Sequence, residues 1–542
     1  MRILKHPFFF TSTIIILCLC LLGLHRISSH SQNKNSKSIQ INITAEPSSL
    51  DPRKARSLND LNVIKMLMEG LTRIDYTNLP VFSLASSIEV SEDKKMYIFE
   101  LKEAFWSSGD KITASDFIYS WTSSLSPSFP SDNASSLYVI KNGEKIKKGF
   151  LDMTDLGVSA PNEKTLVIEL EKPTPYFLEL LASPIFYPIN KKIDQGNPHW
   201  AEESQSYVGC GPFMIESWKH HNTLCVKKNP KYWDYQKISL DKITMVMVAP
   251  ETGFSMFQAK ELDWDGSPFS TLPLDSLPTL KEKKELHSQR FLITSFLRAN
   301  TTKAPFSSVS FRKALSFALN RKEIIDHILL GNSFYASGLV PSCLSLREKE
   351  YFSDNDVCVA KSLLDASLTE GAYQEDLPEI KLSFLSNDKN YRICQAMQEQ
   401  WRKNLGLKVI LEPIESKLFF SRVSRKEYEL CLGSWVADFR DPINFLEVFR
   451  TKDIGTNNTG WENSAYLIDL EKACKTTDEE ERKHLLQECE KILIAEMPII
   501  PLCHGSMNYV KKQELKNVIL SDTGSIDFRK AFIEKSEKKK LL

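Results

Sequence analysis

Few residues in this sequence have the types and spacing that catalysis requires. The triplet Gly209-Cys210-Gly211 lacks the third glycine of a dinucleotide-binding loop, and the sequence contains no G-x-S-x-G motif, Walker A loop or H-E-x-x-H motif. The adjacent His220 and His221 would point in different directions on a strand, whereas zinc ligands on one helix face are spaced i, i+4. We therefore expect these histidines to lie in a surface loop and the protein to use no catalytic residue, metal or cofactor.

The cysteines do not form a recognisable metal or redox motif. Of the 11 cysteines, Cys18 and Cys20 lie in an apolar N-terminal segment, and the other nine form no C-x-x-C pair. A chain of this length can bury a core without a framework of disulfides. Cys343 and Cys358 flank a polar loop and are the one pair that we expect to be bonded.

Composition and charge exclude several classes of protein. The 542 residues suggest roughly three or four domains at about 150 residues each. The 69 basic residues balance the 69 acidic ones, so no net field attracts nucleic acid or an anionic membrane. The apolar content of 42% is that of a globular protein, which excludes disorder as the main state.

The N-terminus has the pattern of an export signal. Two basic residues precede an uncharged stretch of 18 residues, 7–24, after which the sequence turns polar. This stretch is also close to the length that spans a bilayer, so an uncleaved anchor is the alternative. A lipid on Cys18 or Cys20 is a further alternative, although leucine precedes each of them where a lipidation signal has a small residue. We assign residues 1–37 to a signal peptide or anchor.

Hydrophobic patterns predict the elements of the N-terminal part. Residues 39–44 alternate apolar and polar side chains, and Tyr97, Phe99 and Leu101 alternate with Ile98 and Glu100, as in half-buried strands. Between them, residues 61–68 place apolar side chains on one helical face. Thr113 and Asp116 have the spacing of a capping box at the start of a further helix.

The pattern changes along the chain. Residues 151–248 are rich in predicted strands, whereas from about residue 300 strands and helices alternate. Such alternation predicts a mixed or parallel sheet covered by helices, with binding sites beyond the carboxyl ends of its strands. The main predicted elements are helices over 311–319, 320–329 and 394–405, and strands over 380–384, 407–411 and 430–433.

Several sequence blocks resemble one known family. In order, these are PSSLDP with MLMEGL, YIFELKEAFWSSGDKITASDFIYSW, GCGPFMIESWKHHNTLCVKKNPKYWD, PFSSVSFRKALSFALNRKEII and GSWVADFRDP. Together they resemble the family 5 extracellular solute-binding proteins, and especially bacterial oligopeptide-binding proteins of peptide ABC importers. The resemblance covers nearly all of residues 39–530.

The resemblance implies an α/β fold with two lobes that close like a clamp, the periplasmic-binding-protein arrangement of class II, cluster C. Lobe one would comprise residues 39–68, 193–292 and 508–542, with an extra N-terminal subdomain at 69–192. Lobe two would comprise residues 293–507. The hinge would lie at two crossovers, near Phe291–Ser295 and His504–Asn508.

The resemblance also implies a binding mechanism. In such proteins a peptide lies between the lobes, pairs its backbone like an added strand, and places its α-ammonium on a carboxylate of a G-W-x-x-D motif. The matching residues here are Ser434-Trp435-Val436-Ala437-Asp438, so Asp438 would hold the ammonium and Trp435 would form a pocket wall. Without the resemblance, Trp435 would be interpreted as a core residue and Asp438 as a turn residue.

Departures from the family pattern leave the ligand's length and composition open. Leu432 stands where peptide binders often have a cation, and Arg56 and Arg298 stand where the most similar relatives carry Glu. Either arginine could instead be exposed or paired within the protein. In the same alignment Asn390 replaces a His, Ser416 replaces a Trp and Asn133 replaces a Tyr of the family pattern. The remaining expected ligand-binding residues are Gly433, Ser434, Phe439, Phe420, Ser57 and Leu58.

The main hypothesis is therefore an oligopeptide receptor, not an enzyme, that delivers cargo to the permease subunits of an ABC importer. It would be a monomer without cofactor or nucleic-acid partner, located in the periplasm or anchored to the outer face of the inner membrane. Another family cargo (murein peptide, nickel chelate, haem or sugar) is the first alternative. An exported enzyme or chaperone on the same scaffold is the second.

Overall fold

The computed structural model describes residues 37–55, 57–131, 133–344, 346–347, 349–374, 376–453 and 455–534. The expected signal or anchor, apart from Lys37, and Arg56 lie outside the described residues. Among the described residues, no helix is long and apolar enough to cross a membrane.

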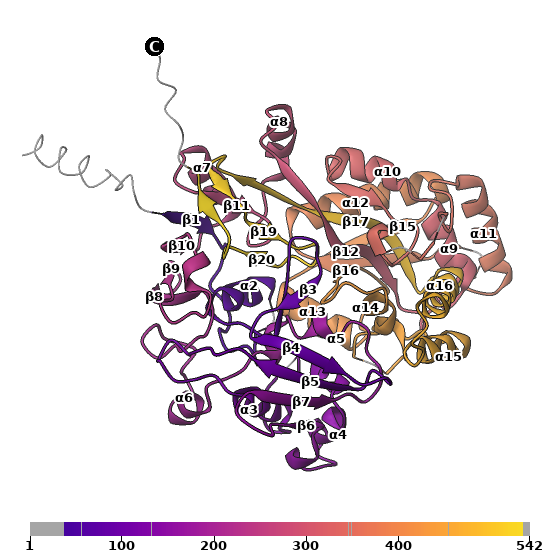
Figure 1. Ribbon diagram of the computed structural model, residues 1–542. Helices are drawn as coiled ribbons and strands as arrows, with labels where there is room; N and C mark the ends of the chain where they lie inside the picture. Colours follow the sequence, from indigo (N-terminus) through magenta and orange to yellow (C-terminus); the bar gives the residue numbers. More distant parts are fainter. Residues whose placement is uncertain are drawn as a thin grey trace, which may run out of the picture.

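One large sheet runs through the molecule (Figure 1). Its strands are β1 (Ser38–Asn42), β8 (Phe213–Lys219), β9 (Thr223–Lys228), β10 (Lys242–Val246), β11 (Trp264–Gly266), β12 (His287–Ala299), β13 (Ser333–Tyr335), β14 (Glu379–Leu385), β15 (Lys408–Ile414), β16 (Leu430–Val436) and β17 (Ile499–Lys511). Within the described residues the order is β15-β14-β16-β12-β17-β11-β1-β10-β9-β8, and β13 also pairs with β17.

Four smaller sheets belong to the N-terminal half and the C-terminal segment. One has the order β4-β5-β7-β6, and the others are the pairs β2-β3, β18-β21 and β19-β20. Their strands are β2 (Thr72–Ile74), β3 (Pro80–Phe82), β4 (Ala85–Val90), β5 (Met96–Leu101), β6 (Val158–Ser159), β7 (Thr165–Glu169), β18 (Leu515–Lys516), β19 (Ile519–Leu520), β20 (Ile526–Asp527) and β21 (Phe532–Ile533).

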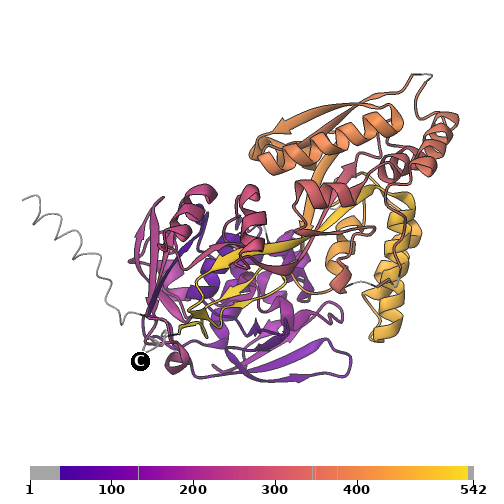
Figure 2. The same ribbon diagram turned by 90° about the horizontal axis from the view of Figure 1, so that it is seen from above.

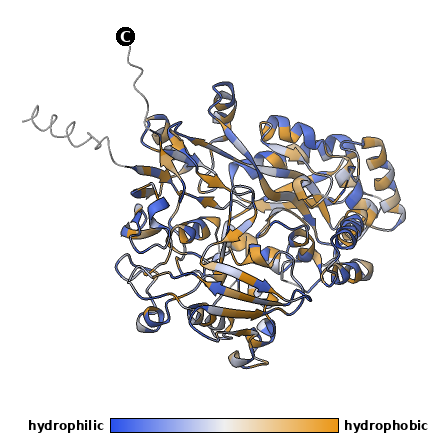
Figure 3. Ribbon diagram, viewed as in Figure 1, coloured by the Kyte–Doolittle hydropathy of each residue, from blue (hydrophilic) through white to orange (hydrophobic). Residues whose placement is uncertain are grey.

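Helices cover these sheets, and the hydrophobic colouring of those beside β14 and β15 alternates along their length, as expected for amphipathic helices (Figure 3). The helices are α2 (Leu58–Leu67), α3 (Ala114–Leu125), α4 (Gly143–Lys147), α5 (Phe177–Leu180), α6 (Lys191–Gly196), α7 (Pro250–Gln258), α8 (Leu277–Glu282), α9 (Val309–Phe317), α10 (Arg321–Glu323) followed by a π-helical turn (Ile324–Ile328), α11 (Val357–Thr369), α12 (Asp388–Leu405), α13 (Ser416–Ser424), α14 (Ile443–Leu446), α15 (Ser464–Ala473) and α16 (Glu479–Glu496).

Local sequence signals explain where these helices begin and end. At the start of α3 the Thr113 backbone N–H donates to the Asp116 carboxylate at 2.8 Å, as the capping box predicts. At the end of α12, Gly406 takes a φ of 72°, which favours glycine. The α12 face that the sequence predicts to be apolar is buried, and Trp401 donates from Nε1 to the Leu315 carbonyl at 2.8 Å.

Two long strands connect the two halves of the molecule. The strands β12 and β17 contain 13 residues each and pair antiparallel from His287 opposite Tyr509 to Arg298 opposite Ile499. Figure 2 shows β17, in yellow, running from the purple part of the molecule into the orange part. The register shifts between Arg290 and Thr294. Both expected crossovers fall in these strands, and the exact lobe and subdomain boundaries stay a prediction.

The cysteines differ from the sequence-based expectation. All nine cysteines of the described part of the chain are free thiols, including Cys343 and Cys358. Cys358 is exposed in the first turn of α11. Cys343 is half-buried, and its thiol interacts with the charges of Asp522, Arg440 and Arg290. The expected disulfide is therefore not present, because a shared polar loop does not bring the two sulfur atoms together.

Candidate ligand-binding site

A cavity of about 660 Å³ lies along the two connecting strands. Its walls come from β12, β16 and β17, from the π-helical turn, from the start of α12, from α13, and from residues 267–277 of the N-terminal half. It therefore lies between the two parts of the chain and next to the carboxyl end of β16, where alternating β and α elements place binding sites.

Half of the residues expected from the sequence to bind ligand line this cavity. They come from four elements, β12, α12, α13 and β16, and β16 contributes four of them in succession. They are Arg298, Asn390, Phe420, Leu432, Gly433, Ser434 and Trp435.

The strand β16 has a free edge at this cavity. Along one edge it pairs with β12 from Ala299 opposite Leu430 to Ile293 opposite Val436. Along the other edge it pairs with β14 only at Leu430 and Cys431. Within the described residues, no strand pairs with that edge beyond Cys431. An extended backbone could hydrogen-bond there.

Asp438 lies two residues beyond the end of β16. It is exposed and is not among the residues that line the cavity. The surrounding protein nevertheless displaces part of its water and raises the pKa of its carboxyl group, an effect that a hydrogen bond with Asn444 and the charge of Lys65 oppose. Asn444 also accepts a hydrogen bond of 2.9 Å from Nε1 of Trp435, so one amide orients both residues.

Lys65 of α2 is a charged neighbour of Asp438 that the sequence did not single out. Its Nζ donates to Ser525 Oγ at 2.9 Å. Burial lowers the pKa of Lys65 to about 8, while the charges of Asp527 and Asp438 oppose this shift. A lysine in the middle of a predicted helix carries no sequence signal that would reveal this position.

The other expected ligand residues do not line the cavity. Ser57 caps α2 by accepting the Asp60 N–H at 3.1 Å, and Leu58 begins that helix. Asn133 donates from Nδ2 to the Ala55 carbonyl at 2.7 Å. These contacts belong to the segment around Arg56.

Two further expected residues also lie elsewhere. Ser416 is exposed in the first turn of α13. Phe439 stacks on Tyr176 with a centroid distance of 4.1 Å. The ligand roles of all these residues stay predictions.

The histidines and acidic residues singled out from the sequence form no metal site in the part of the chain that the structure describes. No group of three or more His, Cys, Asp or Glu side chains there is placed to hold a metal ion. His220 and His221 lie at the β8-β9 turn, as expected for a loop, and contact the Glu46 carboxylate at 2.7 and 2.9 Å.

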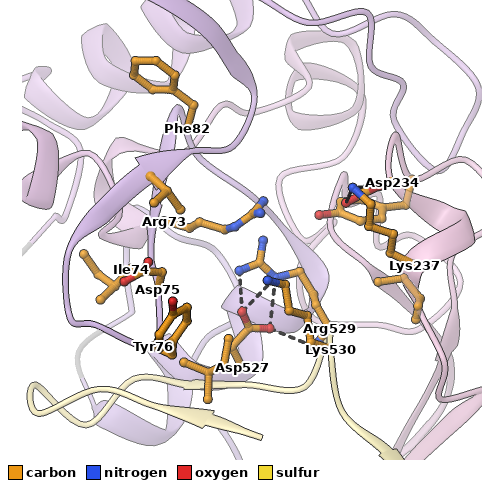
Figure 4. Close-up of a pocket in the computed structure, with 14 residues that line it drawn as sticks. Arg73, Ile74, Asp75, Tyr76, Phe82, Asp234, Lys237, Asp527, Arg529 and Lys530 are labelled. Carbon is orange, nitrogen blue, oxygen red and sulfur yellow. Dashed lines mark hydrogen bonds and ion pairs between the residues drawn. The ribbon is translucent and has the colours of Figure 1, made fainter. Parts of the chain in front are cut away.

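A second cavity, of about 260 Å³, lies between the N-terminal half and the C-terminal segment and shares no lining residue with the first (Figure 4). Arg529 lines it and pairs with both Asp527 and Glu69, at 2.6 Å in the latter case. Arg73 also reaches Glu69, at 3.5 Å. Because these charges neutralise one another, we interpret this cavity as part of the lobe's internal ion-pair network.

Two lobes connected by paired strands, with a cavity between them, define a ligand-binding clamp. The model of the bacterial extracellular solute-binding proteins, family 5, matches residues 80–457. The chain therefore belongs to this family, whose members are extracytoplasmic binding proteins. The membership and the structural matches below confirm the α/β, two-lobed fold.

Individual relatives match over nearly the full chain. The oligopeptide-binding protein OppA of Bacillus subtilis is 40% identical over 510 residues, which cover 93% of this chain and 94% of the relative. The structure of Haemophilus influenzae OppA in complex with the peptide RPPGFSPFR matches with a TM-score of 0.81 and 25% identity, covering 92% of this chain and 99% of that one. The Escherichia coli murein tripeptide-binding protein MppA matches with a TM-score of 0.82 and 27% identity over 92% and 99% of the two chains.

Proposed function

We propose that this protein is the solute-binding component of a peptide ABC importer and that it binds oligopeptides between its two lobes. The observation that carries the proposal is the cavity between the lobes, with the free edge of β16 in its wall. Its similarity to the Bacillus subtilis oligopeptide-binding protein, over 93% of the chain, supports the same ligand class.

The free edge of β16 provides affinity that does not depend on the peptide sequence. A peptide that pairs with the backbone of Leu432–Val436 uses N–H and C=O groups that every peptide has. Half-buried Gly433 and Trp435 and exposed Ser434 leave space for varied side chains. The ligand side chains would then occupy the cavity, beside Phe420 and Trp435.

In this proposal Asp438 holds the α-ammonium of the peptide. The carboxylate follows the β16 edge directly, so a peptide paired with that edge reaches it with one end. The nearby Lys65 does not prevent Asp438 from holding the ammonium. The pKa of Lys65 is lowered to about 8, so the approach of the positively charged peptide ammonium favours loss of its proton.

Calorimetry with Asp438→Asn tests the proposal. A desolvated ammonium without its counter-charge should cost about 2–5 kcal/mol of binding free energy for peptides with a free amino terminus. N-acetylated peptides should bind the unaltered protein poorly. Asp365→Asn, on the exposed face of α11, is the matched control and should bind normally. Equal affinity of the unaltered protein for free and acetylated peptides would remove Asp438 from this role.

The proposal extends to partners and location. The protein would be a monomer without catalytic activity, outside the cytoplasmic membrane, where it would deliver peptide to permease subunits of an ABC transporter. Cell fractionation would show whether it is released in the periplasm or held on the membrane by its N-terminal segment.

A further inference from the structure

Arg298 of β12 is a buried cation without a partner. Only 9% of the residue is exposed, and it lines the cavity between the lobes. Its guanidinium lies 4.8 Å from the centre of the Phe296 ring. Within the described residues, no hydrogen bond or ion pair of this guanidinium is found.

Other buried arginines of the chain show what Arg298 lacks. Arg53 pairs with two carboxylates, those of Asp51 and Asp194. Arg321 pairs with Asp354 at 3.0 Å and donates to the Pro501 carbonyl at 2.7 Å. A guanidinium removed from water costs free energy unless an anion or hydrogen-bond acceptors compensate it. Arg298 has neither among the described residues, so beyond its contact with the Phe296 ring its compensation comes from water or from a ligand.

The guanidinium of Arg298 lies against the backbone of Gly433, two residues along β16 from its register partner Cys431. A Cβ added to Gly433 would lie 1.7 Å from Nη1 of Arg298. Any other residue at position 433 would therefore displace the guanidinium from the cavity wall. Gly433 lies in the strand whose free edge faces the cavity.

The charges that line the cavity all have one sign. Arg298, Arg321 and Lys389 line it, and no Asp or Glu of the described residues does. Lys389 follows the carboxyl end of β14, its charge acts on the cavity residue Cys503, and it has no ion-pair partner among the described residues. Because Arg321 is paired, Arg298 and Lys389 give the cavity a net positive potential.

We propose that this cavity receives a carboxylate of the ligand and that Arg298 binds it, so that the protein prefers peptides with a negative charge at this end. The inference rests on the proposed function, because it assumes a peptide along β16. The planar guanidinium of Arg298 suits a carboxylate, to which it can donate two parallel hydrogen bonds. Lys389, which lines the same cavity, adds attraction.

The spacing of the two charged sites limits the source of that carboxylate. Arg298 lies beside Gly433, and Asp438 is five residues further along the chain. At about 3.3 Å per extended residue, this interval corresponds to at most roughly 17 Å, the length of about five peptide residues. The C-terminal carboxylate of a tetrapeptide or pentapeptide can therefore reach Arg298. In a longer peptide, an acidic side chain at the fourth or fifth position takes its place.

Calorimetry with four matched peptides tests the inference. All have a free amino terminus: a neutral pentapeptide as free acid, its C-terminal amide, and two longer amidated peptides with Glu or Gln at the fifth position. We expect the unaltered protein to favour the free acid over the amide, and Glu over Gln, by about 10- to 100-fold, which is the range of a charge-assisted hydrogen bond. The first pair reports the C-terminal source and the second the side-chain source.

Variants assign the preference to Arg298. In Arg298→Met both ratios should fall most of the way to one, with Lys389 accounting for any remaining preference, and urea unfolding shows whether the variant is folded. Arg298→Lys should keep part of the preference. Gly433→Ala should reduce it without removing a charge. Arg402→Met, on the exposed side of α12, is the control and should keep the full ratios.

Three results would overturn the inference. The unaltered protein could bind the free acid as tightly as the amide, and the Glu peptide as tightly as the Gln peptide. In that case no carboxylate is recognised in this cavity, while the proposed peptide-binding function still stands. Unchanged ratios in Arg298→Met would assign the preference to another cation. If no peptide of the set binds, the proposed function fails together with this inference.

Discussion

Acidification should destabilise the protein through His504, a residue of β17 at the expected hinge. His504 is only 3% exposed. Its Nδ1 lies 2.9 Å from Thr294 Oγ1 of the paired strand β12, and its Nε2 has no hydrogen-bond partner among the described residues. Burial lowers the pKa of His504 to about 3, and the positive charge of Arg347 acts in the same direction.

The sign and the size of the effect follow from this shift. The ordinary pKa of 6.5 applies in the unfolded chain, so the unfolded state binds a proton first as the pH falls. The neutral histidine's contribution to folding is complete above pH 6.5 and is lost progressively between about pH 6.5 and pH 3. Each pH unit in that window costs about 1.4 kcal/mol, so a change from pH 7 to pH 5 costs about 2 kcal/mol.

Urea unfolding at pH 7 and pH 5 measures the effect. The unaltered protein should lose about 2 kcal/mol more of its free energy of unfolding between these pH values than His504→Gln does, because glutamine cannot be protonated. His199→Gln, at a side chain that is 74% exposed, should behave like the unaltered protein. The same pH dependence in His504→Gln and in the unaltered protein would refute the reasoning.

Two further predictions concern closure and the internal ion pairs. Binding of a verified peptide should bring the lobes together about β12 and β17, because a ligand that contacts both lobes stabilises the closed state. Small-angle scattering should then show a smaller radius of gyration. An unchanged radius at saturation would contradict hinge closure. Asp194→Ala leaves the buried Arg53 with Asp51 alone and should cost about 3–5 kcal/mol in urea unfolding. Glu169→Ala, which breaks only the exposed pair with Lys141, should cost no more than about 1 kcal/mol, and equal costs would show that burial of the pair is not decisive.

Secondary structure was predictable wherever a local signal fixed it. The helix α12 has an apolar stripe and a terminal glycine, and in β5 the alternating residues Tyr97, Phe99 and Leu101 are buried. Such patterns depend on residues that are near one another in the sequence. The pairing of β12 with β17, whose partners lie more than 200 residues apart, has no local signal and was not predicted; the family resemblance gave only the two crossovers that fall in these strands.

The site was predictable along one strand and less so around it. The residues from Leu432 to Trp435 line the cavity because they are consecutive in β16. Phe439 follows only a few residues later, but the chain there turns towards the N-terminal half. Tyr176 stacks on its ring, and the neighbouring Arg440 pairs with Asp522 at 2.9 Å. Short distance along the sequence is therefore a poor guide to a binding site once a strand has ended.

The cation that defines the proposed ligand preference shows what a sequence leaves open. From the sequence, Arg298 could be exposed, paired within the protein or directed at a ligand. Only the folded structure shows which of these holds, because it determines whether an acidic side chain lies near the guanidinium. The register of β12 on β16 places Leu297 opposite Leu432 and Arg298 opposite Cys431, so its neighbours there are apolar and no carboxylate is among them. Gly433 then leaves space for the guanidinium. The preference for negatively charged peptides depends on the lack of a protein carboxylate beside Arg298, so it is a property of the folded chain. A substitution that places a carboxylate beside Arg298 should therefore abolish the preference, although the arginine itself is unchanged.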